Sequence, residues 1–134
     1  MGPYRIAVVD DEPSIIALFQ YVFIDAGYTV ETAENGKIAL EKLEGFLPDF
    51  ILLDISMPEM TGPEFVKNWD KMAFSKPMLR NIPFLVMTGE NYINPPVPFG
   101  FEKKKNFKSF VPKMTNPTDV LEMINTALKE AGKV

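Results

Sequence analysis

The sequence predicts a doubly wound α/β fold, in which helices cover both faces of a parallel β-sheet. Short, almost continuously apolar segments alternate along the chain with segments whose apolar residues recur at helical spacing. Strands that are apolar at nearly every position are typical of a parallel sheet buried on both faces. The chain has 134 residues, the size of one compact domain. We therefore expect a single domain over residues 1–134.

Strand and helix patterns alternate through the first half of the chain. The predicted strands are residues 6–9, 29–33 and 50–53. Acidic residues leading to Pro13 are typical of a helix start, and Gly27 is typical of a helix end, so we expect a helix between them. The turn Asn35-Gly36 leads into a shorter helix, expected at about residues 37–43.

The second half of the chain continues this alternation. Pro63 marks the first turn of a helix that is expected to reach about Ala73. The fourth and fifth strands are predicted at residues 82–87 and 109–111. A last helix is expected to begin within residues 116–119, and its predicted buried stripe consists of Val120, Leu121, Ile124 and Leu128.

Residues 91–107 interrupt the pattern, because several prolines in this stretch are incompatible with a helix interior. We expect irregular structure here, with a short helical turn around residues 102–105. The run Lys103-Lys104-Lys105, followed by Lys108, is interpreted as part of a solvated loop. The alternative is a patch for a partner or a nucleic acid, because three phenylalanines lie nearby in the sequence.

The composition excludes several classes of function. The chain contains no cysteine and no histidine, which excludes thiolate zinc sites, cysteine nucleophiles and serine–histidine catalysis. The net charge of −4 argues against direct binding of nucleic acid. We find no secretory signal and no apolar run approaching the roughly 20 residues of a membrane helix. We therefore expect a cytoplasmic protein that does not enter a membrane.

Acidic residues follow two of the predicted strands. In a doubly wound fold the working site lies beyond the carboxyl ends of the strands, so Asp10, Asp11 and Asp54 are expected at one edge of the sheet. Clustered carboxylates need a counter-charge, and their oxygens suit Mg2+. A carboxylate beside such a metal can attack phosphorus as a nucleophile. Thr88 and Lys113 follow later strands and could supply a hydroxyl donor and a positive charge.

Each of these residues also has a purely structural interpretation. Asp11 could cap the first helix, and Asp54 could begin a turn. Thr88 could bond to its own loop, Lys113 could be a solvated lysine, and Phe110 could be an ordinary core residue. The joint arrangement favours the functional interpretation, because nothing structural requires acids, a hydroxyl and a lysine at successive strand ends.

The same residues resemble the receiver family of two-component response regulators. The resemblance rests on Asp10-Asp11, on the segment Leu52-Leu53-Asp54-Ile55-Ser56-Met57-Pro58, on Gly62, on Thr88-Gly89 and on Lys113. It covers nearly the whole chain in order. It implies a five-stranded parallel sheet with strand order 2-1-3-4-5, in a flavodoxin-like three-layer sandwich. The proline-rich stretch stands where the family has its fourth helix, so that helix is expected to be irregular or missing.

The resemblance also implies a role for each site residue. Asp54 is the expected phospho-acceptor, and Mg2+ is expected at Asp10, Asp11, Asp54 and the backbone carbonyl of Ser56. Thr88 and Lys113 are expected to sense the phosphoryl group, and Phe110 resembles the switch aromatic of the family. Gly89 is expected to leave room for the donor. One departure concerns Lys113, because the family usually has proline directly after its lysine, whereas here Pro112 precedes it and Met114 follows.

The resulting hypothesis is a signalling switch rather than an enzyme with its own substrate. A sensor histidine kinase or a phosphotransfer protein would phosphorylate Asp54 and so change a protein-interaction surface. The sequence does not identify the downstream effector protein or domain, and it is compatible with a homodimer. The main alternative is a pseudo-receiver that binds proteins without being phosphorylated. An aspartate-dependent phosphohydrolase is disfavoured because Ser56 stands where that class has a second acid. A flavin-binding protein is disfavoured because Asp10-Asp11 would repel its phosphate.

Overall fold

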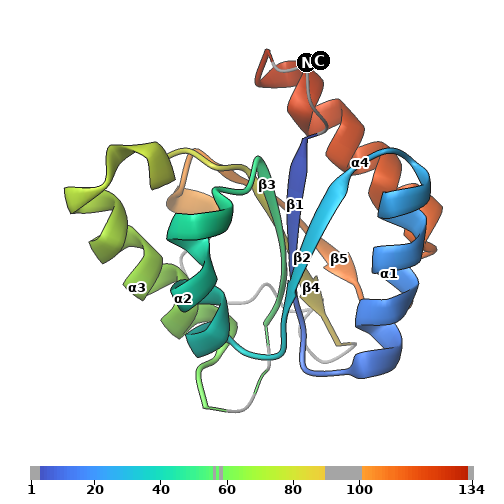
Figure 1. Cartoon of the computed structure of the whole chain (residues 1–134), viewed down its shortest axis with the longest axis horizontal. Helices are drawn as coiled ribbons and strands as arrows, with labels where there is room; N and C mark the ends of the chain where they lie inside the picture. The colour runs from blue at the N-terminus through green and yellow to red at the C-terminus, as the bar shows by residue number, and fades with distance from the viewer. Residues whose placement is uncertain (1–3, 56, 58, 90–100, 133–134) are drawn as a thin grey trace.

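The computed structural model describes residues 4–55, 57, 59–89 and 101–132. Its five strands form one parallel sheet, in the order β2-β1-β3-β4-β5 (Figure 1). The strands are β1 (Arg5–Val9), β2 (Thr29–Ala33), β3 (Phe50–Asp54), β4 (Phe84–Thr88) and β5 (Phe107–Pro112). The predicted strand order and parallel pairing are therefore confirmed.

Helices cover both faces of this sheet, which confirms the predicted three-layer sandwich. The helices are α1 (Pro13–Asp25), α2 (Gly36–Phe46), α3 (Gly62–Ser75) and α4 (Pro117–Glu130), with the 3-10 helices η1 (Pro77–Leu79) and η3 (Phe101–Lys103). Helices α1 and α4 lie on one face, and α2 and α3 lie on the other (Figure 1). Among the described residues, no helix is long and apolar enough to cross a membrane.

The core consists of two clusters of buried side chains, one on each face of the sheet. Alternate residues of β3 contribute to them: Ile51 and Leu53 pack toward α2 and α3, whereas Phe50 and Leu52 pack toward α1 and α4. Every residue of β3 and of β4 is buried. This burial on both faces explains why the two segments are almost wholly apolar in the sequence.

Local sequence signals explain where the helices begin. Thr61 caps α3 by accepting a hydrogen bond from the Glu64 amide, while the Glu64 carboxylate accepts one from the Thr61 amide. This reciprocal arrangement satisfies two amide donors that the first turn leaves unpaired. The side chain of Asn35 caps α2 in a similar way, by accepting from the Ile38 amide.

Several predicted boundaries differ from those observed. Strand β4 begins at Phe84 rather than at residue 82, because Pro83 has no amide hydrogen to donate to a neighbouring strand. Helix α2 extends to Phe46, beyond the expected residue 43. Strand β5 is longer than predicted and begins at Phe107.

The irregular stretch predicted at residues 91–107 falls mostly outside the described residues, which resume at residue 101. Within the described part, the 3-10 helix Phe101–Lys103 corresponds to the short helical turn that was expected slightly later in the chain.

Candidate functional site

Three buried polar residues lie at the carboxyl edge of the sheet, which is the lower edge in Figure 1. Asp10 directly follows β1, Asp54 ends β3 and Thr88 ends β4. Among the described residues, these are the polar or charged ones that are buried. Parallel strands place their carboxyl ends at one edge, so the fold brings together side chains that are far apart in the sequence.

Lys113 reaches into this group from the end of β5. Its Nζ atom lies 3.2 Å from Asp54 Oδ2, 3.4 Å from Asp10 Oδ1 and 2.6 Å from Glu12 Oε1. The Lys113 amide donates a 2.9 Å hydrogen bond to the Thr88 carbonyl, which continues the pairing of β4 with β5 past Pro112. The chain therefore delivers Lys113 to the two buried aspartates although Pro112 precedes it and Met114 follows it. Its side chain is only 18% exposed, so it is not the solvated lysine of the structural interpretation.

The start of α1 differs from the structural interpretation of Asp11. The residue that caps α1 is Glu12, and its side chain makes no capping hydrogen bond. The Glu12 amide instead donates a 2.9 Å hydrogen bond to Asp10 Oδ1. Asp11 is exposed beside these two residues. The interpretation of Asp11 as the helix cap is therefore wrong, because the cap position of α1 is Glu12, one residue later, and no side chain accepts a capping hydrogen bond there.

The electrostatics of the site follow from its burial. Burial raises the pKa of the Asp10 carboxyl above its ordinary value, although the hydrogen bond from Glu12 and the charge of Lys113 oppose this rise. For Lys113, burial alone lowers the pKa, but the hydrogen bond to Glu12 and the charges of Asp54 and Asp10 together raise it above its ordinary value. Lys113 is thus a permanent positive charge held among three carboxylates.

Two atoms of the site are buried without a hydrogen-bond partner among the described residues, namely Asp10 Oδ2 and Thr88 Oγ1. Because a buried polar atom without a partner is costly, such atoms are typical of sites that complete their bonding with a ligand. One carboxylate oxygen each from Asp10, Asp11 and Glu12 can lie within 4.8 Å of the others. This oxygen-only set fits a hard divalent cation such as Mg2+.

The structure places most of the residues that the sequence selected for the metal site. Asp10 and Asp11 belong to the carboxylate group, and Asp54 contacts the same lysine nitrogen as Asp10. Ser56, predicted to contribute its backbone carbonyl, lies outside the described residues. Glu12 was missed, because it was interpreted only as part of a helix start. The available signal was its position next to the acidic pair.

Gly62 packs directly against the backbone at the end of β3. The Gly62 amide donates a 2.9 Å hydrogen bond to the Ile55 carbonyl. A Cβ atom at this position would lie 2.9 Å from the Asp54 carbonyl oxygen and 2.9 Å from the Ile55 Cα atom. Both neighbours are backbone atoms, so only glycine fits without displacing the end of β3. By contrast, a Cβ atom at Gly89 would meet no described atom within 4 Å.

Phe110 lies on the same face of the sheet as Thr88. Phe110 pairs with Val86 and Pro112 pairs with Thr88, so residues two apart on each strand share that face. The Phe110 ring is half-buried, and its centroid lies 5.0 Å from that of Phe107 and 5.9 Å from that of Phe101. The structure therefore makes Phe110 the rim of an aromatic cluster; its role as a switch stays a prediction.

Comparison with known proteins identifies the family. The sequence model of the response regulator receiver domain matches residues 6–125. The chain belongs to this receiver domain family. Receiver domains of two-component regulators bind Mg2+ at an acidic pocket, and they interact with histidine kinases and effector domains.

Individual relatives agree with this assignment. The receiver domain is 30% identical to protein Rrf1 of Nitratidesulfovibrio vulgaris over 131 residues, which cover 98% of this chain and 87% of that protein. It is 43% identical over 75 residues to PhoP of Bacillus subtilis, a regulatory protein of alkaline phosphatase synthesis. That match covers 56% of this chain but only 31% of PhoP, so it spans about a third of the relative's length.

Solved structures of receiver domains superpose on nearly the whole chain. A CheY-like receiver domain protein from Methanospirillum hungatei has a TM-score of 0.80 at 27% identity, covering 98% of both chains. The chemotaxis response regulator CheY4 of Vibrio cholerae has a TM-score of 0.75 at 33% identity, covering 94% of this receiver domain and 99% of CheY4. The predicted resemblance to receiver domains is therefore confirmed.

Proposed function

We propose that Asp54 accepts a phosphoryl group from a phosphohistidine of a partner histidine kinase or phosphotransfer protein. The observation that carries this proposal is the contact of 3.2 Å between Lys113 Nζ and Asp54 Oδ2 at the carboxyl edge of the sheet. Lys113 supplies a fixed positive charge where a phosphoryl group on Asp54 would add negative charge. Phosphoryl transfer depends mainly on such positioning and charge stabilisation, so the lack of a histidine in this chain is no obstacle.

The transfer is a displacement at phosphorus. A carboxylate oxygen of Asp54 forms a bond to phosphorus, while the phosphorus–nitrogen bond of the donor breaks and its electron pair stays on the imidazole nitrogen. Lys113 pairs with the phosphoryl oxygens. The Thr88 hydroxyl, which has no partner among the described residues, donates a hydrogen bond to one of them. Beyond its own phosphorylation and dephosphorylation, we assign the domain no enzymatic activity.

The acidic residues of the site would hold Mg2+. Asp10, Asp11 and Asp54, with the Ser56 carbonyl, are the expected ligands, and Glu12 joins them because its carboxylate lies in the same group. When bound, Mg2+ would offset the negative charge of the carboxylates and of the phosphoryl oxygens. The unpartnered Asp10 Oδ2 atom supports this assignment, because coordination would satisfy it.

The output of the switch is a change in a protein-interaction surface. A bond from Thr88 to the phosphoryl group would draw this side chain toward Asp54 and free space on the face that it shares with Phe110. Inward movement of Phe110 would then alter the surface around β5. We propose that residues 1–134 act as one receiver domain, and that its downstream partner recognises this surface.

Phosphorylation is tested by incubating the protein with acetyl phosphate and Mg2+ and measuring the intact mass. We expect the mass to rise by one phosphoryl group, and we expect no rise in Asp54→Asn or without Mg2+. The matched control is Asp49→Asn, which removes an acid from the opposite edge of the sheet and should leave the reaction unchanged. An unmodified wild-type protein would favour the pseudo-receiver, which acts by protein binding alone.

A further inference from the structure

The edge of the sheet opposite Asp54 contains a groove that the phosphorylation reaction does not use. Two hollows, of about 510 Å3 and about 240 Å3, lie beside the amino ends of β3, β4 and β5. They share Asn81, Pro83 and Ala131, so they adjoin one another, and we describe them together as one depression. We call it the rim groove and define it by Leu47, Met78, Arg80, Pro83, Lys105 and Lys108.

The rim groove is bordered by apolar side chains that folding does not bury. Met78 is 63% exposed and Leu47 is 41% exposed. Leu47 also has a φ angle of 50°, in the left-handed region that disfavours residues with a side chain. Leu47 caps the carboxyl end of α2, where a left-handed residue is common, and its exposed side chain adds little apolar burial to the domain.

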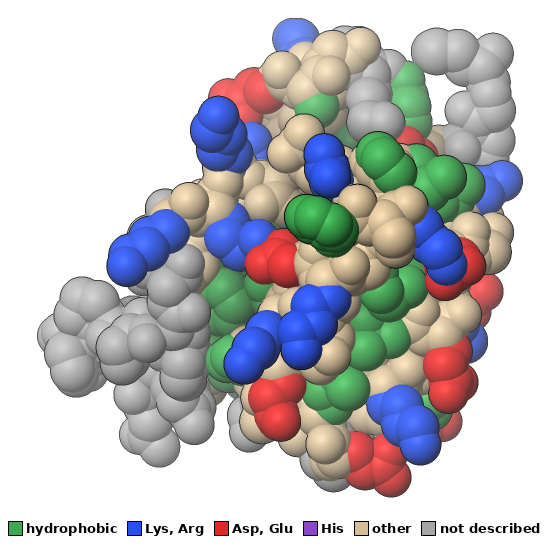
Figure 2. All heavy atoms as spheres, turned by 90° about the vertical axis from the view of Figure 1, so that its left-hand side faces the viewer, with side chains coloured by type: hydrophobic (Ala, Val, Ile, Leu, Met, Phe, Trp, Pro, Cys, Tyr) green, Lys and Arg blue, Asp and Glu red, His purple; other side chains and the backbone are tan. Residues whose placement is uncertain are grey.

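Positive charge gathers along the same groove. Arg80, Lys105 and Lys108 line it. Asp49, the one acid among its described lining residues, accepts a 2.8 Å hydrogen bond from the Arg5 amide. This local excess contrasts with the net charge of −4 of the whole chain. Figure 2 shows Lys and Arg side chains among exposed apolar ones on the neighbouring face formed by α2 and α3. The groove therefore complements a ligand that is both acidic and apolar.

The walls of the groove are held in place by hydrogen bonds. The Arg80 guanidinium donates to the Ala73 carbonyl at 3.1 Å, and Asn106 Nδ2 donates to the Ile82 carbonyl at 2.9 Å. Next to Met78, the Leu79 carbonyl accepts a 2.8 Å hydrogen bond from the buried indole of Trp69. A groove with fixed walls binds a ligand at a lower entropic cost than a mobile loop does.

We propose that the rim groove docks an acidic segment of a partner protein that carries an apolar side chain, whether or not Asp54 is phosphorylated. A protein segment fits better than a membrane surface, because the site is a depression lined by both charged and apolar residues. Three cations are also few for a nucleic acid. Because the groove and Asp54 lie at opposite edges of the sheet, a docked partner would leave the acceptor open to a kinase.

The test uses fluorescently labelled synthetic peptides rich in Glu and Asp, with a central Leu or with Ser in its place. We expect the Leu peptide to bind saturably by fluorescence anisotropy, and the Ser peptide to bind about tenfold more weakly. In NMR titrations, the amide shifts should be largest at residues 47–49, 78–83 and 105–108. Asp54→Asn and treatment with acetyl phosphate should change the affinity less than about twofold, so this outcome does not depend on whether Asp54 is phosphorylated.

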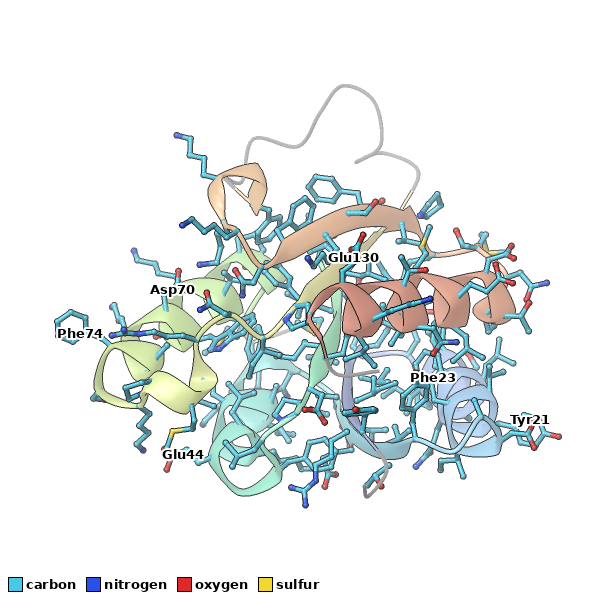
Figure 3. The ribbon with its side chains drawn as sticks, turned by 90° about the horizontal axis from the view of Figure 1, so that it is seen from above. Tyr21, Phe23, Glu44, Asp70, Phe74 and Glu130 are labelled. Carbon is cyan, nitrogen blue, oxygen red and sulfur yellow. The ribbon has the colours of Figure 1, made fainter. Side chains whose placement is uncertain are left out.

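Variants locate the binding. Lys105→Glu/Lys108→Glu should weaken binding at least about tenfold, whereas Lys37→Glu/Lys67→Glu, with the same change of net charge, should not. Met78→Ser should also weaken it, and Phe74→Ser should not, because Phe74 points away from the domain at the end of α3 (Figure 3). The proposal is overturned if no peptide saturates, if both charge variants behave alike, or if DNA or anionic vesicles compete fully with the peptide.

Discussion

Glu12 holds the ammonium group of Lys113 more closely than Asp54 does. The distance from Lys113 Nζ is 2.6 Å to Glu12 Oε1 and 3.2 Å to Asp54 Oδ2. Glu12 is about half exposed, whereas the Lys113 side chain is largely buried. Lys113 is therefore held by the two buried carboxylates of Asp10 and Asp54 and by a closer hydrogen bond to the exposed carboxylate of Glu12.

Removing the charge of Lys113 should destabilise the metal-free domain. Lys113→Met leaves two buried carboxylates without their shared cation, so we expect a loss of about 3 kcal/mol in the free energy of unfolding at pH 7. Urea denaturation in EDTA measures this change. Lys42→Met, which breaks the exposed pair with Glu31, is the control and should cost less than about 1 kcal/mol. Equal effects of the two substitutions would show that the buried cluster does not need its lysine.

Asp10 should make the metal-free domain less stable as the pH rises. Burial raises its native pKa above the ordinary 3.8, so between these two values the native state binds more protons than the unfolded chain. Stability therefore falls as the pH increases through this window. Asp10→Asn removes the penalty and keeps an oxygen that can accept from the Glu12 amide.

We expect Asp10→Asn to melt a few degrees higher than wild type at pH 7 in EDTA. The difference should shrink as the pH falls through the raised native pKa of Asp10, because a protonated Asp10 no longer carries the buried charge that the Asn variant lacks. Thermal unfolding followed by circular dichroism at a series of pH values measures the melting temperatures of the wild type and of Asp10→Asn. A difference in melting temperature that is independent of pH would contradict the assignment to the buried carboxyl.

Two glycines should respond in opposite ways to substitution by alanine. Gly62→Ala forces a Cβ atom against the backbone of Asp54 and Ile55, so we expect a loss of about 2 kcal/mol and slower phosphorylation by acetyl phosphate. Gly45→Ala adds a methyl group to an exposed position of α2 where no described atom lies within 4 Å. It should stabilise the domain by about 0.5 kcal/mol. Chemical denaturation and intact mass check both variants.

The buried indole of Trp69 should contribute through its hydrogen bond. Trp69→Phe leaves the Leu79 carbonyl without its donor, so we expect unfolding to become easier by about 2 kcal/mol, including the lost packing. The control is Tyr28→Phe, which removes an exposed hydrogen bond to Asn125 and should cost less than about 1 kcal/mol. Urea denaturation compares them, and equal costs would mean that burial of the bond is unimportant.

The sequence was sufficient for the topology because a parallel sheet leaves a strong signal. Strands β3 and β4 are buried on both faces and are apolar along almost their whole length. Helix α3, which lies between them in the chain, begins at a recognisable cap, Thr61. The start of β4 was predicted too early, because the apolar pattern takes no account of the missing amide hydrogen of Pro83.

The site was only partly predictable, because residue types show which chemistry is available but not which contacts form. The positions of Asp10, Asp54, Thr88 and Lys113 followed from strand ends. The contact of Glu12 with Lys113 did not, because it joins residues about a hundred positions apart through two flexible side chains. For the same reason, no sequence motif marks the rim groove, because its lining comes from residues shortly before or at the start of β3, β4 and β5 and from Ala131 after α4.

The described chain starts and finishes at the same edge of the sheet. Strand β1 begins at Arg5 on the edge opposite Asp54, and α4 runs back to that edge, where it ends at Glu130 (Figure 1). Sequence fused before or after these elements would leave the domain on the side away from Asp54. The architecture thus suits insertion as a module into longer proteins in either order, and a fluorescent tag or surface anchor placed at either terminus should leave phosphorylation kinetics unchanged.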